Sequence, residues 1–594
     1  MAAGPSVTYR SRRRRRRRAL RRALLSATVA GCVLAVSGGW IGLRGWEARG
    51  HLINAAALAG DLSDQVMAGD TEQARRTLVA LQGQAAGAHD VTTGPAWWTA
   101  AHVPYAGRDV AAVRAIAASI DDLAGDAFPA LIGLDPSDLL PTGGKLNLAA
   151  LREAAPAFAS ADEVVQRVRT RLDAVPAADL LPPIRDAIQA LRAQIERLSA
   201  LTSAGHQGTA LLPELLGADG PRTYLLLLQN LAESRSTGGI FGAYAVVQTD
   251  HGQITMTNRG AGGDLQQFPA PVLPLDAATK ALYTDRIGVY PADVNLTPDF
   301  PTAAQLFREM YRQRTGVTVD GVLATDPVAL SYLLGAIGPV PMAGQPTLTA
   351  ANAVGTLLSD PYQQIASEDD RHDYFAASVL AVFDALTHRS TDPRTVLAAL
   401  DRAAGERRVL FWSARPAEQA ALAGTELAGV LPQQEPVPGV GVFLNDGSGS
   451  KLDYYLTHSA TLSVGDCRGD GRRELSLHLT LGSTAPATGL PAAVTGLGLA
   501  GDPDTARIVT YLFSPAHGSL VDAKLDGVPV PLGSGTDHGR QVGVVSLDIP
   551  PGRSRVLDVN LLAPAVPSNT ARLWLTPGVA PWNTHINPAP ACAQ

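Results

Sequence analysis

The sequence predicts a multi-domain α+β protein with an N-terminal transmembrane helix, an α-helical bundle, a layered α/β domain with a mixed sheet, and a C-terminal β-sandwich. Three observations support this prediction. An apolar stretch, ALLSATVAGCVLAVSGGWIGL, contains no charged side chain; apolar residues then recur at helical spacing; and near the C-terminus they alternate as in strands. The predicted segments are a basic cytoplasmic tail (1–22), a transmembrane helix (23–43), a membrane-proximal bundle (44–205), an α/β domain (206–432) and a β-sandwich (438–594).

The apolar stretch 23–43 has the length of a membrane span. At about 1.5 Å per residue a helix of this length reaches roughly 30 Å, the thickness of the hydrocarbon core. Because Lys and Arg are retained on the cytoplasmic side, the preceding arginines place the N-terminus inside and the rest of the chain outside. Trp40 and Trp46 suit the outer membrane interface. These ten arginines are Arg10, Arg12 to Arg18, Arg21 and Arg22.

Other interpretations of the N-terminus are a cleaved signal peptide, a twin-arginine export signal and a nucleic-acid-binding arm. A signal peptide has a shorter apolar region and a small-residue cleavage site, and residues 42–46 (GLRGW) offer no such site. The arginine run beside an apolar segment is typical of topology and of binding to anionic lipid. We therefore predict an uncleaved signal anchor and a single-pass protein of the cell membrane, with the bulk of the chain extracytoplasmic.

Charge and cysteine usage agree with this topology. The whole chain carries −6, so the ten positive charges of residues 1–43 leave −16 for the rest. An acidic surface of this kind excludes nucleic acid as the expected partner. Cys32 lies in the predicted span, whereas Cys467 and Cys592 lie on the oxidising side, where we predict that they form a disulfide.

Helical and strand patterns follow one another along the external part. Leu180, Ile184, Ile188, Leu191, Ile195 and Leu198 form one apolar stripe, and further helices are expected over 52–84, 107–132 and 147–176. Such helices predict a bundle that serves as a spacer or docks a partner. Strand and helix patterns then alternate from Thr223 to residue 429, which predicts the α/β domain. PQQEPVPGVG (432–441) is a linker by composition, and Leu475, Leu477, Leu479 and Leu481 begin the strand pattern of the sandwich.

Common catalytic motifs are mostly absent. The sequence contains no H-E-x-x-H, C-x-x-C, complete P-loop or G-x-S-x-G. Residues 496–501 match G-x-G-x-x-G, but Asp502-Pro503 follows where a helix should begin, so we interpret the match as accidental. The residues alone predict no cofactor.

The most informative polar cluster is QNLAESRSTGG (229–239), expected at the end of the first strand. Asn230, Glu233 and Arg235 are candidate ligand-binding groups, because loops at strand ends often carry them. Gly238 and Gly239 are candidates for turning backbone amides toward an anion.

Carboxylates at three expected helix starts form a second set of candidates. Asp299 lies in NLTPDFP, Asp326 in TDP, and Asp370 beside Arg371 in EDDRHDYF. Capping of the helix is the commoner role of such acids. Arg235 and Arg371 have no capping role to explain them.

At these residues the sequence resembles a bacterial membrane-anchored family known as domain of unknown function 4012. The likeness covers roughly 221–430 and is carried by YLLLLQNLAESRSTGGIFGAY, NLTPDFPTAAQLF, VDGVLATDPVALSYLLGAIGPV, LTAANAV and DDRHDYF. More remotely, the order of the last three segments is similar to that of LytR-CpsA-Psr proteins. Those are anchored enzymes that transfer glycopolymers from polyprenyl pyrophosphate to peptidoglycan.

The remote resemblance implies a fold and a chemistry. A pyrophosphate would be held by Arg235, Arg259 and Arg371, with Asp299 or Asp370 as ligands of a divalent metal ion such as magnesium. One departure is that Arg222 is followed by Thr223-Tyr224, where that family has Asp soon after the Arg that opens its first strand.

Two hypotheses follow for function. The first is a non-catalytic extracytoplasmic scaffold or binding module of the cell envelope that engages glycan or protein partners. The alternative is a glycopolymer (phospho)transferase that acts on polyprenyl-pyrophosphate-linked substrate. The sequence leaves open whether the chain is an enzyme.

Overall fold

A computed structural model describes residues 44–590 except 63–64, 66–69, 104–106, 135–143, 177–178, 343–344, 366, 390–391 and 567. The predicted cytoplasmic tail (1–22), the predicted span (23–43) and Cys592 lie outside the described residues. No helix within the described part of the chain is long and apolar enough to cross a membrane. The chain divides into two compact units, which comprise residues 1–135 with 149–212 and residues 136–148 with 213–594.

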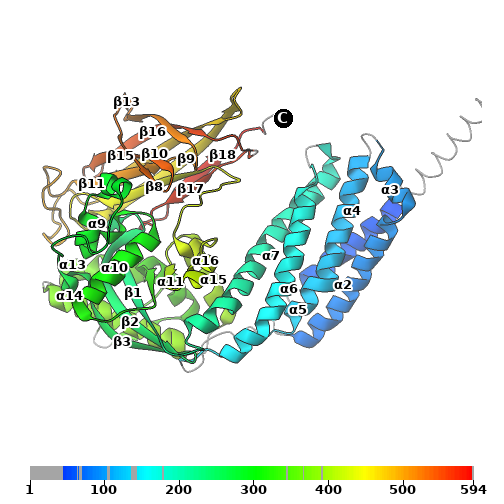
Figure 1. Cartoon of the computed structure of the whole chain (residues 1–594), viewed down its shortest axis with the longest axis horizontal. Coiled ribbons are helices and arrows are strands. Elements are labelled where there is room, and N and C mark those ends of the chain that lie inside the picture. Colours follow the sequence, from blue (N-terminus) through cyan, green and yellow to red (C-terminus); the bar gives the residue numbers. More distant parts are fainter. Residues whose placement is uncertain are drawn as a thin grey trace, which may run out of the picture. The chain divides into compact units, whose positions relative to one another are not determined.

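The first unit is helical (Figure 1). Residues 44–62 form its first described helix, and α2 begins at Thr71 because Asp70 accepts a hydrogen bond from the amide of Gln73 as its N-cap. The backbone of Asp70 is not helical, so the single helix predicted over 52–84 is interrupted there. The other helices are α2 (Thr71–Thr92), α3 (Pro95–Ala101), α4 (Gly107–Asp122), a π-helical turn (Leu123–Ala127), α5 (Phe128–Ile132), α6 (Leu148–Asp173) and α7 (Pro182–Leu215).

The apolar stripe predicted along residues 180–198 is confirmed as a buried face, which belongs to α7 from Ile184 onward, whereas Leu180 lies just before the helix. Leu180, Ile188 and Ile195 are buried, and the stripe's other members are half-buried against the same cluster. Facing them are apolar residues of α4 and α6, among them Ile116 and Val165. Helices with one apolar face must bury it against each other, and this cluster is where they do so.

A mixed five-stranded sheet forms the centre of the second unit. Its strand order is β3-β2-β1-β4-β7, in which β1 and β4 are parallel and the other neighbours antiparallel. The prediction of an α+β protein with a mixed sheet is therefore confirmed. The strands are β1 (Arg222–Arg235), β2 (Gly238–Asp250), β3 (Gln253–Ala261), β4 (Gly321–Thr325) and β7 (Leu410–Ser413).

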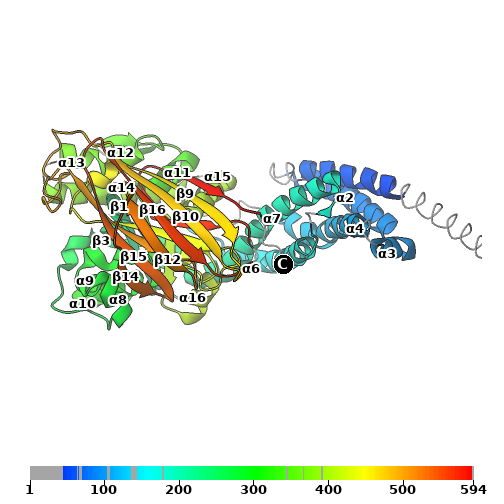
Figure 2. The same ribbon diagram turned by 90° about the horizontal axis from the view of Figure 1, so that it is seen from above.

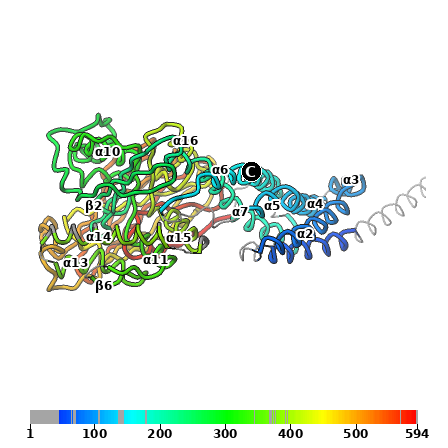
Figure 3. Tube along the Cα trace, turned by 90° about the horizontal axis from the view of Figure 1, so that it is seen from below, coloured from blue at the N-terminus to red at the C-terminus, as the bar shows by residue number. Residues whose placement is uncertain are grey.

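Helices cover both faces of this sheet, and Figure 3 shows α10 and α14 on opposite sides of β2. Phe300 and Phe307 of α10 pack with Phe241 and Tyr244 of β2 in one hydrophobic cluster. The larger helices of this region are α10 (Phe300–Thr315), α11 (Pro327–Ile337), α14 (Glu368–His388) and α15 (Pro393–Gly405). Shorter elements are α8 (Ala277–Tyr283), α9 (Arg286–Val289), a 3-10 helix (Pro291–Leu296), β5 (Val340–Met342), β6 (Gln345–Leu348), α12 (Ala353–Leu358), α13 (Asp360–Gln364), α16 (Pro416–Leu422) and a 3-10 turn (Glu426–Ala428).

Beyond residue 438 the chain forms two further sheets (Figure 2). One has the order β13-β12-β16-β10-β9-β18 and the other β14-β15-β11-β8-β17. The alternating leucines of β10 are buried together with Val442 of β8 and Leu547 of β15, so both sheets contribute to one hydrophobic cluster. The strands are β8 (Gly439–Asp446), β9 (Leu456–Cys467), β10 (Arg473–Ser483), β11 (Ala506–Phe513), β12 (Ser519–Leu525), β13 (Val528–Pro529), β14 (Gly533–Asp537), β15 (Arg540–Ile549), β16 (Ser554–Ala563), β17 (Arg572–Leu575) and β18 (Asn583–Asn587).

The segment 432–441, a linker by composition, is fixed in place by buried polar contacts. Arg540 is almost fully buried and donates to the carbonyl of Pro432 and to the carboxylate of Glu435. That carboxylate also accepts from the amides of Gly439 and Ala516. The hydrophobic cluster around β1 and β2 continues past this segment, since it includes Phe443, Phe513 and Trp574.

Candidate functional site

The polar cluster 229–239 lies in a β-hairpin rather than in a loop at a strand end. β1 continues to Arg235, which is the register partner of Gly238 in β2. Gly238 has φ +140°, and a Cβ on Gly239 would lie 2.2 Å from the carbonyl oxygen of Asn230, so the turn requires both glycines. The amide of Gly239 donates to Gln229 Oε1 at 3.3 Å. The amide of Gly239 is thus directed at a protein oxygen in this structure, and an anion site at Gly238 and Gly239 stays a prediction.

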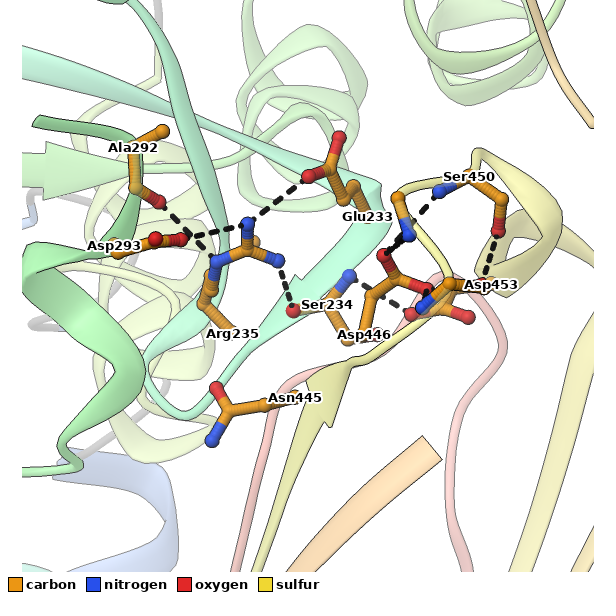
Figure 4. A network of polar contacts seen from close by, with 12 residues as sticks. Glu233, Ser234, Arg235, Ala292, Asp293, Asn445, Asp446, Ser450 and Asp453 are labelled. Carbon is orange, nitrogen blue, oxygen red and sulfur yellow. Dashed lines mark hydrogen bonds and ion pairs between the residues drawn. The ribbon is translucent and has the colours of Figure 1, made fainter. Parts of the chain in front are cut away.

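Arg235 is buried at the end of β1 and each of its three nitrogen atoms donates a hydrogen bond (Figure 4). Nε donates to the carbonyl of Ala292 at 3.2 Å, and Nη1 to that of Ser234 at 2.9 Å. Nη2 donates to Glu233 Oε1 at 3.0 Å and to Asp293 Oδ1 at 3.3 Å. Because two of these acceptors, Ala292 and Asp293, belong to the 3-10 helix Pro291–Leu296, Arg235 joins β1 to that helix.

Lysine and a second arginine extend this network of ion pairs. The other carboxylate oxygen of Glu233 accepts from Lys451 Nζ, and Asp293 Oδ2 accepts from Nε and Nη2 of Arg286. Burial alone would raise the pKa of Glu233, but the positive charges of Lys451 and Arg235 lower it below its ordinary value. Glu233 is thus held as a carboxylate.

Two more acids, Asp446 and Asp453, join the network, which then contains four carboxyl groups and three cationic side chains. The carboxylate of Asp446 accepts from three backbone amides and one hydroxyl of the loop 448–450. Asp453 Oδ2 accepts from the amide of Ser234 at 2.8 Å, whereas its buried Oδ1 has no hydrogen-bond partner among the described residues. Burial and the nearby charge of Asp446 raise the pKa of Asp453 well above its ordinary value. Burial raises the pKa of Asp446 as well. Four acids thus lie beside three cations, Arg235, Arg286 and Lys451, and this excess of negative charge favours a proton on the pair Asp446 and Asp453.

A second group of polar side chains surrounds the half-buried ring of Tyr362. Asn230 Nδ2 donates to its hydroxyl at 2.5 Å. Lys451 Nζ lies 5.7 Å and Arg371 Cζ 5.5 Å from the ring centroid, within the range of a cation–π contact. Arg371 Nη1 also donates to the carbonyl of Ile365 at 2.7 Å. We call Asn230, Tyr362, Arg371 and Lys451 the Tyr362 group.

The structure connects four of the predicted site residues and separates others. Lys451 links the Tyr362 group to Glu233 and, through it, to Arg235. Arg259 lies exposed on β3, where it is the register partner of Ala245. Asp370 is exposed on the first turn of α14, next to Arg371 in the chain.

Asp299 and Asp326 have capping roles. Asp299 accepts from the amide and the hydroxyl of Thr302 as the N-cap of α10. Asp326 caps α11 and also accepts from Arg408 Nη1 at 3.0 Å. In the described chain no group of three or more His, Cys, Asp or Glu side chains is arranged to hold a metal ion. A metal site at Asp299 or Asp370 therefore stays a prediction.

The charge of Asp299 also acts on His538, in the β14–β15 turn. A hydrogen bond to Asp537, with the charges of Asp299 and Asp276 nearby, raises the pKa of His538 to about 9. Asp537 in turn accepts from the hydroxyl of Tyr283 at 3.1 Å.

Sequence reasoning missed Asp293, Tyr362, Asp446, Lys451 and Asp453. Each lies far along the chain from residues 229–235 or in a segment with no motif, so no spacing marks it. The one available signal was composition: Lys451 is one of only four lysines in the chain.

Comparisons with known proteins found a match for one part of the chain. No curated protein matches the chain. The likeness to LytR-CpsA-Psr proteins stays a prediction. Over residues 219–362, which include Asn230, Glu233, Arg235 and Tyr362, the chain matches the model of the family described as Protein of unknown function (DUF4012).

Proposed function

We propose that the chain is a membrane-anchored extracytoplasmic protein of the bacterial cell envelope that acts as a scaffold or binding module for a glycan or protein partner. The observation that carries the non-catalytic proposal is the use of Arg235 inside the fold, where all three of its nitrogen atoms donate to protein groups. A pyrophosphate needs several cationic donors that face the ligand.

Arg222, a second arginine of β1, also supports the non-catalytic proposal. Its guanidinium is buried and donates to both oxygens of Glu418, at 3.1 and 3.0 Å, with Asp320 Oδ1 3.3 Å from its Nε. The arginine that opens the first strand thus ties β1 to α16.

The Tyr362 group is the part of this region whose chemistry suits a partner. An aromatic ring beside an amide and two cations can stack on a sugar and contact its acidic substituents. We therefore assign the binding role to the half-buried side chains of Asn230, Tyr362, Arg371 and Lys451.

The alternative is a transferase acting on polyprenyl-pyrophosphate-linked glycopolymer. It is favoured by one observation, the presence of Arg371 and Lys451 on the same aromatic ring. These are the cations that would have to contact the pyrophosphate in place of Arg235.

Mass spectrometry of glycans and lipids that co-purify with the full chain, extracted from membranes in mild detergent, tests the proposal. We expect an envelope glycan with the wild-type protein, at least about tenfold less of it with Arg371→Gln, since loss of a charged contact costs over 1 kcal/mol, and no change with Arg259→Gln. Arg259 is the matched control because it is an exposed arginine of the same unit, outside the Tyr362 group.

The same preparations are incubated with a polyprenyl-pyrophosphate-linked glycan and magnesium. Release of polyprenyl phosphate by the wild-type protein, lost in Arg371→Gln and retained in Arg259→Gln, would establish the transferase and overturn the non-catalytic proposal. If the wild-type protein retains no glycan, or if Arg371→Gln retains as much glycan as the wild type, the glycan-binding role of the Tyr362 group is overturned.

A further inference from the structure

Two tryptophans on different helices of the first unit are exposed, although tryptophan usually buries most of its ring. Trp46, on the helix 44–62, is 75% exposed, and Trp98, on α3, is 56% exposed. Val103, just beyond α3, is 51% exposed. Exposed apolar side chains of this size mark an interaction surface when they gather at one place.

The fold brings these two helices together at the first residues that the structure describes. Trp97, the neighbour of Trp98, is buried, and its Cη2 atom lies 4.0 Å from the position of a Cβ on Gly45. Figure 1 shows α3 beside the start of the described chain. The sequence alone gave no reason to place residues 97–103 near residue 45, because a whole helix, α2, lies between them.

The location of this surface indicates its partner. Residue 44 directly follows the apolar stretch 23–43, so in the anchored topology the outer membrane interface lies at this end of the helix 44–62. Indole rings gain free energy at headgroup depth, where one edge stays wet. Arg49, whose guanidinium lies 5.7 Å from the ring centroid of Trp46, adds a positive charge that anionic headgroups attract.

We propose that α3 is a second membrane-contacting element, in which Trp98 and Val103 enter the headgroup layer beside the point where the chain leaves the bilayer. The ring of Trp98 is held in place for this role by His102, whose ring centroid lies 4.3 Å away, and by the burial of Trp97 behind it. The contact fixes the first unit to the membrane surface at two points instead of one. This inference rests on the anchored topology of the proposed function.

The full chain, reconstituted in vesicles of phosphatidylcholine and phosphatidylglycerol, provides the test. Tryptophan emission is recorded with ordinary lipid and with lipid brominated near the headgroup end of its acyl chains, for wild type and for Trp98→Phe. We expect the wild-type-minus-variant emission, which reports Trp98, to be blue-shifted and to fall by about half in brominated lipid, as for an interfacial ring. Trp412→Phe is the control, because that ring is buried in the core of the second unit and its emission is shielded from lipid.

Each other result overturns the inference in a recognisable way. Trp98 emission that is red-shifted and quenched by aqueous iodide shows a ring in water. Emission protected from both iodide and brominated lipid shows that a protein surface, such as a second copy, covers Trp98. Carbonate washing of the vesicles distinguishes failure of the anchor from failure of the α3 contact. A chain that washes off refutes the anchor itself, whereas a retained chain with unquenched Trp98 refutes only the role of α3.

Discussion

Asp453 shows how one buried side chain can couple the stability of the second unit to pH. Its carboxyl group is almost inaccessible and lies near the charges of Asp446 and Glu233, which together raise its pKa well above that of the unfolded chain. The folded state therefore holds one more proton than the unfolded state between the two pKa values, and stability falls as the pH rises through that window. Below the unfolded pKa the group makes no difference.

Asp453→Asn should remove this pH dependence. The amide keeps the shape of a neutral carboxyl group and can still accept from the amide of Ser234. We expect the variant to match the wild type in thermal unfolding near pH 4 and to exceed it increasingly at alkaline pH. A wild-type midpoint that rises with pH relative to the variant would contradict the raised pKa of Asp453.

The pKa of His538 is also raised, but here the causes are the hydrogen bond to Asp537 and the negative charge of neighbouring carboxylates, which stabilise the protonated imidazole. Its folded-state pKa of about 9 lies above the ordinary 6.5, so its stabilising effect is fully present below pH 6.5 and is lost as the pH approaches 9. Because the side chain is half exposed, solvent screening reduces the effect to about 1 kcal/mol.

We expect His538→Gln to lower the free energy of unfolding by that amount near pH 6 and to leave it unchanged above pH 9, as measured by urea unfolding at both values. His517→Gln, a matched histidine with a similar positive φ, is the control. Equal destabilisation at both pH values would attribute the effect to the turn rather than to the charge.

At the scale of elements, the last described residues bear on the predicted disulfide. β18 runs parallel to β9, with Asn587 opposite Ser463, and the carbonyl of Pro590 accepts from Arg473 at 2.7 Å. Arg473 is the register partner of Cys467. The described chain therefore approaches Cys467 two residues before it would reach Cys592.

We expect peptide mapping of the non-reduced protein to recover Cys467 joined to Cys592, and reduction to lower stability by about 4 to 5 kcal/mol, as closure of a loop of roughly 125 residues implies. Cys467→Ser should reproduce the effect of reduction. Recovery of both cysteines as free thiols from protein made outside the reducing cytosol would refute the pairing.

Regular periodicity made most elements predictable. Its absence explains why the cluster 229–239 was expected in a loop at a strand end, although it lies in the β1–β2 hairpin. The stripe of α7 and the alternating leucines of β10 follow from local spacing alone. The second half of β1 does not, because some of its buried polar groups are satisfied by partners about two hundred positions away, such as Asp453 for the amide of Ser234. The candidate site was predictable as a cluster of residue types, whereas the groups that accept hydrogen bonds from Arg235 were not.

At the scale of the whole molecule, the α/β region and the β region share one core. Phe443, Phe513 and Trp574 belong to the same hydrophobic cluster as residues of β1 and β2, and Asn445 and Asp453 bind backbone amides of the β1–β2 hairpin. A segment that looks like a linker in composition can thus cross a continuous interior, since composition does not report what packs on either side.

We expect a chain truncated after residue 432 to be unable to fold its α/β region, because truncation exposes the apolar surface that these aromatic rings cover. Limited proteolysis should digest it from about residue 213 onward while leaving the first unit protected. The full chain, cut under the same conditions, is the control. A protease-resistant fragment ending near residue 432 would show that the α/β region is independent.

Trp574 and β18 lie within the last two dozen residues, yet the former helps to fill the interior around the first strands and the latter pairs with β9. The second unit must therefore wait for nearly its whole length to emerge before its interior can close, which makes folding dependent on distant contacts and slow. A ribosome that stops before Trp574 and β18 are made would release a polypeptide whose apolar interior is exposed to water, and quality-control proteases would meet it in that form.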